Sequence, residues 1–204
     1  MAKSAWEAKL LAAVEAALRP GDIFFDIGAW IGPYTLLGSR LVKDAGRVYA
    51  FEPDPIAKQL LDRNIDANLC SNVTVVQAAV SDRDGFAPFI TESNLADSNS
   101  RLADCRSPFT CDVQTYRLDS FCLLNNVIPD IVKIDIEGGE RIISSGFGNS
   151  LNRARTIFME VHHQHLAALG VDAPNFIRDM ASTLGATTTQ LDDGPMASRI
   201  VFTR

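Results

Sequence analysis

The chain has 204 residues, of which 47% are hydrophobic and 22% are charged, and its formal net charge at pH 7 is -6. These values are typical of one globular domain, and we expect a single domain over residues 1–204. The acidic balance and the absence of a lysine or arginine cluster argue against a nucleic-acid partner. Since no apolar run is long enough to cross a bilayer, we expect no membrane partner either.

The cysteines show neither zinc-site spacing nor the density of a disulfide scaffold. No C-x-x-C pair occurs among them, and they stand at Cys70, Cys105, Cys111 and Cys122. We therefore expect reduced thiols in a cytoplasmic protein. The sequence is equally compatible with a monomer and a homo-oligomer.

The first segment has apolar residues at helical spacing from Ala5 to Leu18, before Pro20 and Gly21 end the pattern. We expect this helix, within residues 1–19, to pack on the edge of the main sheet and to cap the site as a lid. Together with the loop over residues 91–107, it is expected to select the substrate.

Apolar runs and amphipathic segments alternate through the rest of the chain. Strands are expected at residues 23–25, 47–51, 72–76, 86–90, 111–118, 131–135 and 156–161, and helices at 34–42, 55–68, 119–124, 140–147 and 175–184. A terminal hairpin is expected from residues 186–191 and 199–203, around the turn residues 192–195. This alternation predicts an α/β fold with a mostly parallel, doubly wound sheet.

A glycine turn follows the first strand, with the sequence Asp26-Ile27-Gly28-Ala29-Trp30-Ile31-Gly32. Gly28 permits a backbone turn with positive φ, and Gly32 permits close approach of a ligand or of the following helix. The D-x-G-x-x-x-G spacing differs from the G-x-G-x-x-G of dinucleotide binders, and a phosphate loop is absent. An oxidoreductase using NAD is therefore disfavoured, whereas Asp26 suits a ligand with an ammonium group.

Four carboxylates each follow an apolar strand, and we expect them to line one rim of the sheet, because ligands of open parallel sheets bind outside the carboxyl ends of the strands. They are Asp26, Glu52, Asp135 and Glu160. Glu52 lies about 25 residues beyond the first turn, a spacing suited to binding a ribose diol. S-adenosylmethionine carries both a ribose and an ammonium group, so it satisfies Asp26 and Glu52 together.

Several motifs together resemble the FkbM-type methyltransferases over roughly residues 20–165. They are Asp26-Ile27-Gly28-x-x-x-Gly32, Phe51-Glu52-Pro53, the segments 72–82 and 117–119, and Ile131-Val132-Lys133-Ile134-Asp135-Ile136-Glu137-Gly138-Gly139-Glu140. The resemblance implies a class I, Rossmann-like methyltransferase with a seven-stranded sheet, helices on both faces and a C-terminal antiparallel hairpin. It also implies methyl transfer from S-adenosylmethionine to a hydroxyl of a sugar or other small metabolite, with S-adenosylhomocysteine as product.

The resemblance also assigns cofactor contacts by position. It implies that the first turn binds the methionine part and that Glu52 binds the ribose. It further implies that the residues after the third strand contact the adenine and that Asp135 lies beside the reactive methyl group. The predicted cofactor-binding residues are Asp26, Gly28, Ala29, Gly32, Glu52, Ala79, Val80 and Asp135. The acid usual at the end of the third strand is replaced by Gln77-Ala78. Trp30 and Tyr34 are expected to form the pocket floor.

Transfer to a neutral hydroxyl requires removal of a proton. The base candidates are Asp135, Glu137, Glu160, His162 and His163. Histidine pKa values near neutrality favour His162 or His163, while strand-end geometry favours Asp135 and Glu160. Adjacent histidines point in different directions, so at most one faces the site. We predict Asp135, Glu160 and His162 as catalytic residues, and we expect structural roles for Glu137 and Glu140 at a helix start.

Two further alternatives concern mechanism and function. Asp135 and Glu160 can instead hold a divalent metal ion that lowers the pKa of the acceptor hydroxyl, an arrangement similar to that of catechol O-methyltransferase. Lys133 is expected either to pair with one of these carboxylates or to be a strand-edge lysine. The functional alternatives are an inactive nucleoside-binding protein and a methyltransferase that acts on a macromolecule.

Overall fold

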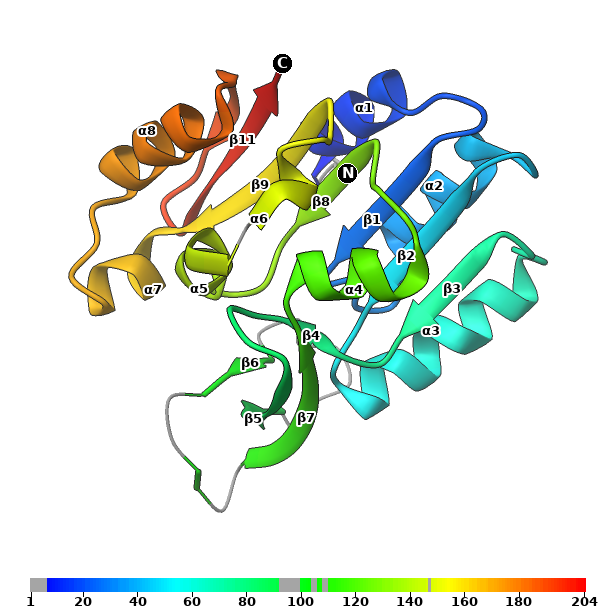
Figure 1. Cartoon of the computed structure of the whole chain (residues 1–204), viewed down its shortest axis with the longest axis horizontal. Helices are drawn as coiled ribbons and strands as arrows, with labels where there is room; N and C mark the ends of the chain where they lie inside the picture. The colour runs from blue at the N-terminus through cyan, green and yellow to red at the C-terminus, as the bar shows by residue number, and fades with distance from the viewer. Residues whose placement is uncertain (1–6, 92–99, 104–105, 108–109, 147) are drawn as a thin grey trace, which may run out of the picture.

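The computed structural model describes residues 7–91, 100–103, 106–107, 110–146 and 148–204. Its main sheet has seven strands in the order β10-β11-β9-β8-β1-β2-β3 (Figure 1). The strands are β1 (Ile23–Ile27), β2 (Arg47–Phe51), β3 (Val73–Val76), β8 (Ile131–Ile134), β9 (Thr156–His162), β10 (Thr187–Asp193) and β11 (Ala197–Thr203). β11 runs antiparallel to both of its neighbours, β10 and β9, and the other pairs are parallel, so the expected mostly parallel sheet with a terminal hairpin is confirmed.

Helices cover both faces of this sheet, as expected. The helices are α1 (Ala8–Ala17), α2 (Pro33–Val42), α3 (Pro55–Ala67), α4 (Leu118–Asn125), α5 (Glu140–Gly146), α6 (Gly148–Leu151), α7 (His163–Ala168) and α8 (Ala173–Leu184). Phe24 and Ile131 of the strands share one buried cluster with residues of α1 and α2. Phe25 and Val132, one position further along, share another with residues of α4, α6, α7 and α8. This alternation explains why the central strands are apolar throughout.

The N-terminal helix packs on a face of the sheet, where it contacts the edge strand β10, as expected, and also the inner strand β9. Leu10 and Val14 of α1 are buried against Phe24 and Phe158, which belong to the central strands β1 and β9. The apolar stripe of the helix is wide enough to cover strands near the middle of the sheet. The part of the predicted helix before residue 7 lies outside the described residues.

A second, smaller sheet stands beyond the carboxyl ends of the parallel strands (Figure 1). It consists of β4 (Ala79–Val80), β5 (Gly85–Ile90), β6 (Arg101–Leu102) and β7 (Thr110–Tyr116), in the order β4-β7-β5-β6. The sequence pattern indicated two of these strands but not that they leave the main sheet. Most of the expected loop over residues 91–107 lies outside the described residues, and β6 falls within it.

Cys70, Cys111 and Cys122 are free thiols, while Cys105 lies outside the described residues. Among the helices that the structure describes, none combines the length and apolar character needed to span a bilayer.

Candidate active site

A cavity of about 270 Å³ lies outside the carboxyl ends of β1, β2 and β8. The small sheet forms one wall with Ala79, Val80, Phe89 and Leu102, and the first turn forms another with residues 28–30. Among the described residues, the lining includes five carboxylates and two cations, namely Glu7, Glu52, Asp54, Asp135, Glu137, Arg101 and Lys133. The cavity thus combines an apolar wall with an acidic floor and rim.

Gly28 is required by close packing between two strand ends. Its φ is +77°, and a Cβ there would lie 1.7 Å from the backbone oxygen of Asp135. Gly28 and Ala29 both donate their N–H groups to the carbonyl of Phe51, at 3.1 and 3.0 Å. The turn is therefore fixed by backbone contacts, and Gly28 and Ala29 line the cavity as predicted.

Gly32 serves the helix and not the cavity. A Cβ at Gly32 would lie 2.5 Å from Leu61 Cδ1 of α3, and Gly32 is not among the residues that line the cavity. Of the two alternatives for this glycine, the structure shows close approach of a helix, although the helix is α3 and not the one that directly follows. A direct contact of Gly32 with a ligand in this cavity is not supported.

Glu52 lines the cavity with its carboxylate held by backbone groups. The N–H of Trp30 donates to Oε2 at 2.7 Å, and the N–H of Asp54 donates to Oε1 at 2.8 Å. Burial raises the pKa of Glu52 to about 7, against the opposing effect of these two hydrogen bonds. A carboxylate accepts about four hydrogen bonds, so about two acceptor positions are left for a ligand.

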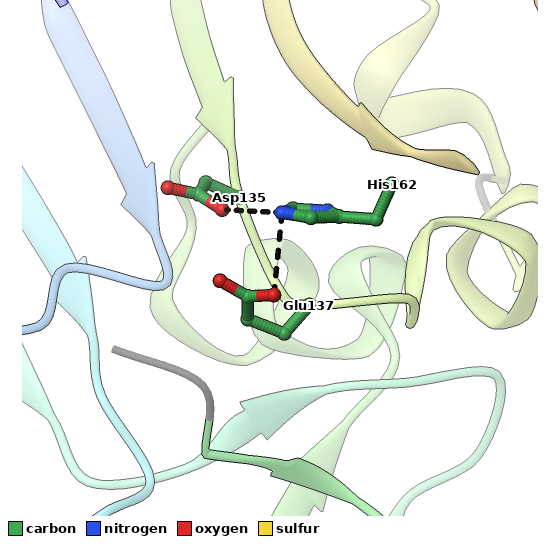
Figure 2. Close-up of side chains that lie close together, drawn as sticks. All are labelled: Asp135, Glu137 and His162. Carbon is green, nitrogen blue, oxygen red and sulfur yellow. Dashed lines mark ion pairs between the residues drawn. The ribbon is translucent and has the colours of Figure 1, made fainter. Parts of the chain in front are cut away.

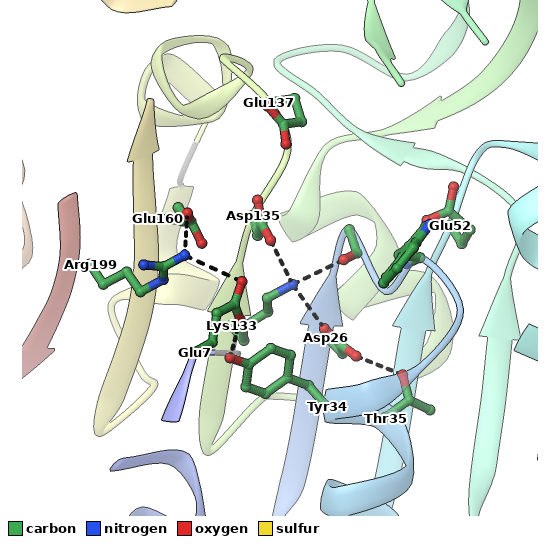
Figure 3. Close-up of polar contacts among 12 residues, drawn as sticks. Glu7, Asp26, Tyr34, Thr35, Glu52, Lys133, Asp135, Glu137, Glu160 and Arg199 are labelled. Atoms are coloured by element: carbon green, nitrogen blue, oxygen red, sulfur yellow. Dashed lines mark hydrogen bonds and ion pairs between the residues drawn. The ribbon is translucent and has the colours of Figure 1, made fainter. Parts of the chain in front are cut away.

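Asp26 lies beneath the cavity and does not line it. Asp26 of β1 and Lys133 of β8 occupy the same register position in neighbouring parallel strands, and Lys133 Nζ lies 3.6 Å from Asp26 Oδ1 (Figure 3). Thr35 donates its hydroxyl to Asp26 Oδ2 at 2.6 Å. Burial raises the pKa of Asp26, while the Lys133 ammonium opposes the rise. The predicted contact between Asp26 and a ligand ammonium is thus not supported by this position.

Lys133 is central to the site, although strand-edge exposure was one expectation for it. It is 3% exposed, lies on a central strand, and contacts Asp135 Oδ2 at 3.4 Å and the Gly28 carbonyl at 3.0 Å. Burial alone would lower the pKa of Lys133, but the charges of Asp135 and Asp26 raise it. The lysine therefore stays charged, and pairing with a strand-end carboxylate is confirmed.

Glu160 does not line the cavity and pairs with a residue of the terminal hairpin. Arg199 of β11 stands opposite Glu160 of β9 and donates to its Oε1 at 2.9 Å (Figure 3). The same guanidinium reaches Glu7 at 3.3 Å, and Glu7 also accepts the hydroxyl of Tyr34. Burial and the nearby Asp135 raise the pKa of Glu160 to about 7, against the effect of Arg199. Glu7 lines the cavity, whereas Glu160 does not, and the expected common rim of four acids is therefore wrong.

His162 is the last residue of β9, and its ring faces Asp135 and Glu137 (Figure 2). Nε2 lies 3.3 Å from Glu137 Oε2 and 3.8 Å from Asp135 Oδ1, while Nδ1 lies 2.7 Å from Oε1 of the buried Glu140. Burial would lower the pKa of His162, but Glu140, Glu137 and Asp135 raise it to about 9. At neutral pH, His162 is therefore protonated and does not match the pKa of a general base.

Glu140 lies in the first turn of α5, as expected, whereas Glu137 lies before that helix. Glu137 lines the cavity, has a φ of +50°, and carries a pKa raised to about 7 by burial and by the charges of Asp135 and Glu140. A non-glycine residue at positive φ is uncommon and marks strain that often accompanies function. Glu140 is fully buried, as a structural residue should be.

His163 points elsewhere, which confirms that only one of the two adjacent histidines faces the site. Its Nε2 lies 2.7 Å from the hydroxyl of Ser198. Trp30 and Tyr34 both line the cavity, as expected. Sequence reasoning did not single out Glu7 or Arg101, which lie beyond the strand-end motifs. The available signal was that each lies within a segment expected to select the substrate.

Asp135 and Glu160, the predicted metal ligands, lie close together, but Arg199 contacts Glu160. Carboxylate oxygens of Asp135, Glu160 and Glu7 lie within 4.8 Å of one another, and Arg199 contacts two of the three side chains. Asp135, Glu137 and His162 form a second group with the same spacing limit. Asp135 is common to both groups.

The sheet order and the terminal hairpin define the class I methyltransferase fold. A precorrin-6y C5,15-methyltransferase from Geobacter metallireducens superposes with a TM-score of 0.59 at 14% identity, covering 100% of this chain and 92% of that one. An O-methyltransferase from Bacillus cereus superposes with a TM-score of 0.57 at 17% identity, covering 98% and 82%.

Residues 26–186 match the family described as the methyltransferase FkbM domain, and the chain belongs to this family. It is 26% identical over 142 residues to the hexuronic acid methyltransferase AglP of Haloferax volcanii, and 29% identical over 176 residues to the 31-O-demethyl-FK506 methyltransferase FkbM of Streptomyces tacrolimicus. These matches cover 69% and 71% of this chain, but 56% of AglP and 67% of FkbM. The chain thus spans little more than half the length of AglP.

Proposed function

We propose that this protein transfers a methyl group from S-adenosylmethionine to a hydroxyl of a small molecule. The observation that carries this proposal is the cavity itself, whose lining includes more carboxylates than cations and an apolar wall. Such a site favours a positively charged nucleoside over a pyrophosphate. Membership of the FkbM methyltransferase family supports the same cofactor.

The residues present fit this cofactor. Glu52 has acceptor positions left beside its two backbone hydrogen bonds, and a ribose diol can donate to them. Ala79, Val80 and Phe89 offer an apolar wall to the adenine. The backbone of Gly28 and Ala29 is assigned to contact the methionine part of the cofactor. Asp26 contributes indirectly, because it fixes Lys133 beneath the cavity.

The acceptor end of the cavity is assigned to Asp135, Glu137 and His162. When bound, S-adenosylmethionine supplies an electrophilic methyl group. The chain itself contributes alignment of the acceptor and a route for its proton. Among the residues there, the Glu137 carboxyl, with a pKa of about 7, is matched to accepting a proton at neutral pH, while protonated His162 fixes its position at 3.3 Å.

The names of two relatives support a small hydroxyl compound as the acceptor. AglP is named for a hexuronic acid and the Streptomyces protein for the 31-oxygen of a small molecule. We propose that the whole chain acts as one domain, in which the N-terminal end of α1 places Glu7 at the cavity.

Calorimetric titration with S-adenosylmethionine and S-adenosylhomocysteine tests this proposal. We expect both to bind with micromolar dissociation constants, and NAD to bind at least tenfold more weakly. Absence of binding by both would overturn the assignment. An inactive binder is separated from an enzyme by incubation with a panel of uronic acids and macrolide alcohols and by measuring S-adenosylhomocysteine formation.

A further inference from the structure

Asp135 and Glu137, which line the cavity, and His162, whose ring faces them, bring three metal-binding atoms close together (Figure 2). Nε2 of His162 lies 3.3 Å from a Glu137 oxygen and 3.8 Å from an Asp135 oxygen, and the three atoms all lie within 4.8 Å of one another. Ligands at about 2.1 Å from one ion lie about 3.0–3.4 Å apart in tetrahedral or octahedral geometry. Only small side-chain movements are needed to reach that spacing.

The imidazole is oriented as in metal sites. Nδ1 of His162 lies 2.7 Å from Oε1 of Glu140, which is fully buried and also accepts the N–H of Gly138 at 3.2 Å. Metal-binding histidines usually donate their second ring nitrogen to such a carboxylate, which fixes the ring and leaves the other nitrogen for the ion. The second oxygen of Glu140 is buried and has no hydrogen-bond partner among the described residues.

Charge balance supports a cation at the same point. Four carboxylates, those of Asp26, Asp135, Glu137 and Glu140, lie in contact through this network, and the fixed cations beside them are Lys133 and Arg101. A divalent ion with a neutral His162 would make the group formally neutral.

The neighbouring triple of Glu7, Asp135 and Glu160 is a poorer site. Arg199 lies 2.9 Å from Glu160 and 3.3 Å from Glu7, so a cation already occupies the space between their carboxylates. This triple also offers no nitrogen ligand. The two groups share Asp135, which turns Oδ2 toward Lys133 and Oδ1 toward His162.

We propose that Asp135, Glu137 and His162 bind one divalent transition-metal ion, with Glu140 as the positioning residue for the imidazole. A mixed set of two carboxylates and one imidazole suits Mn²⁺ better than Mg²⁺. Binding replaces the Nε2 proton of His162, which leaves to solvent. In the ion-bound protein Glu137 is a ligand, and the ion takes over from its carboxyl in assisting ionisation of the acceptor hydroxyl; only this role in turnover rests on the proposed function.

Titration of chelator-treated protein with Mn²⁺ alone, followed by electron paramagnetic resonance of the free ion, tests the site. We expect one ion per chain, with Mg²⁺ bound at least tenfold more weakly. His162→Gln and Glu137→Gln should each weaken Mn²⁺ binding at least about tenfold. Two matched controls, His163→Gln and Glu160→Gln, should change Mn²⁺ binding less than about twofold. The reason is that the His163 ring contacts Ser198 and the Glu160 carboxylate contacts Arg199.

Pulsed electron paramagnetic resonance of the Mn²⁺-loaded wild-type protein gives a test that does not depend on the folding of a variant. Coordination by His162 should give a nitrogen hyperfine coupling that His163→Gln retains. Absence of that coupling, no saturable binding up to millimolar Mn²⁺, or equal losses in His162→Gln and His163→Gln would overturn the proposal. A loss confined to Glu160→Gln would move the site to the other triple.

The cofactor titration on the same metal-free protein keeps the two proposals separate. Mn²⁺ binding without S-adenosylmethionine binding would contradict the proposed function and support the metal site. Cofactor binding without Mn²⁺ binding would overturn the metal site alone.

Discussion

The two sides of the cavity are built by different forces. At the ends of β1 and β2, backbone N–H groups fix the first turn and the carboxylate of Glu52. At the ends of β8 and β9, charged side chains hold one another in place. Lys133 pairs with Asp26 and Asp135, and Arg199 pairs with Glu160. Removing a charged side chain should therefore cost more stability on the second side than on the first, where backbone contacts fix the turn.

The largest expected effect is loss of the buried ammonium in Lys133→Met. Removing one partner of a buried ion pair leaves Asp26 uncompensated at 0% exposure, which costs about 3–5 kcal/mol in the free energy of unfolding. Urea denaturation measures it. The matched variant Lys58→Met breaks only a surface pair with Asp62 and should cost less than about 1 kcal/mol. Equal losses would contradict the comparison.

Gly28→Ala tests the side built by backbone contacts. The new Cβ would lie 1.7 Å from the Asp135 carbonyl oxygen, and alanine would have to adopt the positive φ of Gly28. We therefore expect a loss of about 2–4 kcal/mol in unfolding free energy. The control is Gly21→Ala, whose φ is +92° but whose Cβ would meet nothing within 4 Å. It should cost only about 1 kcal/mol. A control as damaging as Gly28→Ala would show that backbone conformation, not packing, dominates.

Glu52→Gln tests ligand binding on that side. The change removes a charged acceptor from the ribose, and we expect S-adenosylmethionine affinity to fall by about 1.5–3 kcal/mol in calorimetry. Glu160→Gln is a matched control, because this strand-end glutamate also has a pKa raised to about 7 but does not line the cavity. If both variants bind the cofactor like the wild type, the ribose assignment is wrong.

The last expected effect is on the pH dependence of stability. Burial raises the pKa of Glu52 from 4.5 to about 7, so the folded state binds its proton more tightly than the unfolded state does. Its contribution, about 3 kcal/mol for this shift, is present in full below pH 4.5 and is lost as the pH rises through 7. The urea midpoint of Glu52→Gln should fall less over this interval than that of the wild type. Superimposable profiles would refute the pKa shift.

The sequence alone predicted the strands of the main sheet in chain order and the helices other than α6 and α7. The apolar strands, the glycine turn and the terminal hairpin are local patterns, and local patterns predict local structure. Glu52 was also predictable as a cavity residue, because its position depends on the turn after β1 and the end of β2. These two segments are adjacent in the sheet and close in the chain.

The small sheet was not predictable in the same way. β4 and β7 pair across more than thirty intervening residues, and nothing in Ala79 or Val80 indicates a partner that far along the chain. The same limit applied to α1, because the stripe of Leu10 and Val14 specifies burial but not the part of the sheet that buries it.

Only the tertiary structure decided which strand-end acids reach the cavity. Asp26 and Glu160 match the sequence pattern as well as Glu52 and Asp135, yet each stands in register with a cation on the neighbouring strand, Lys133 in one case and Arg199 in the other. Register joins residues far apart in the sequence, and a buried carboxylate is stable only beside such a partner. The charge of each neighbour therefore fixed where these acids point, and left Glu137 and His162 to complete the site.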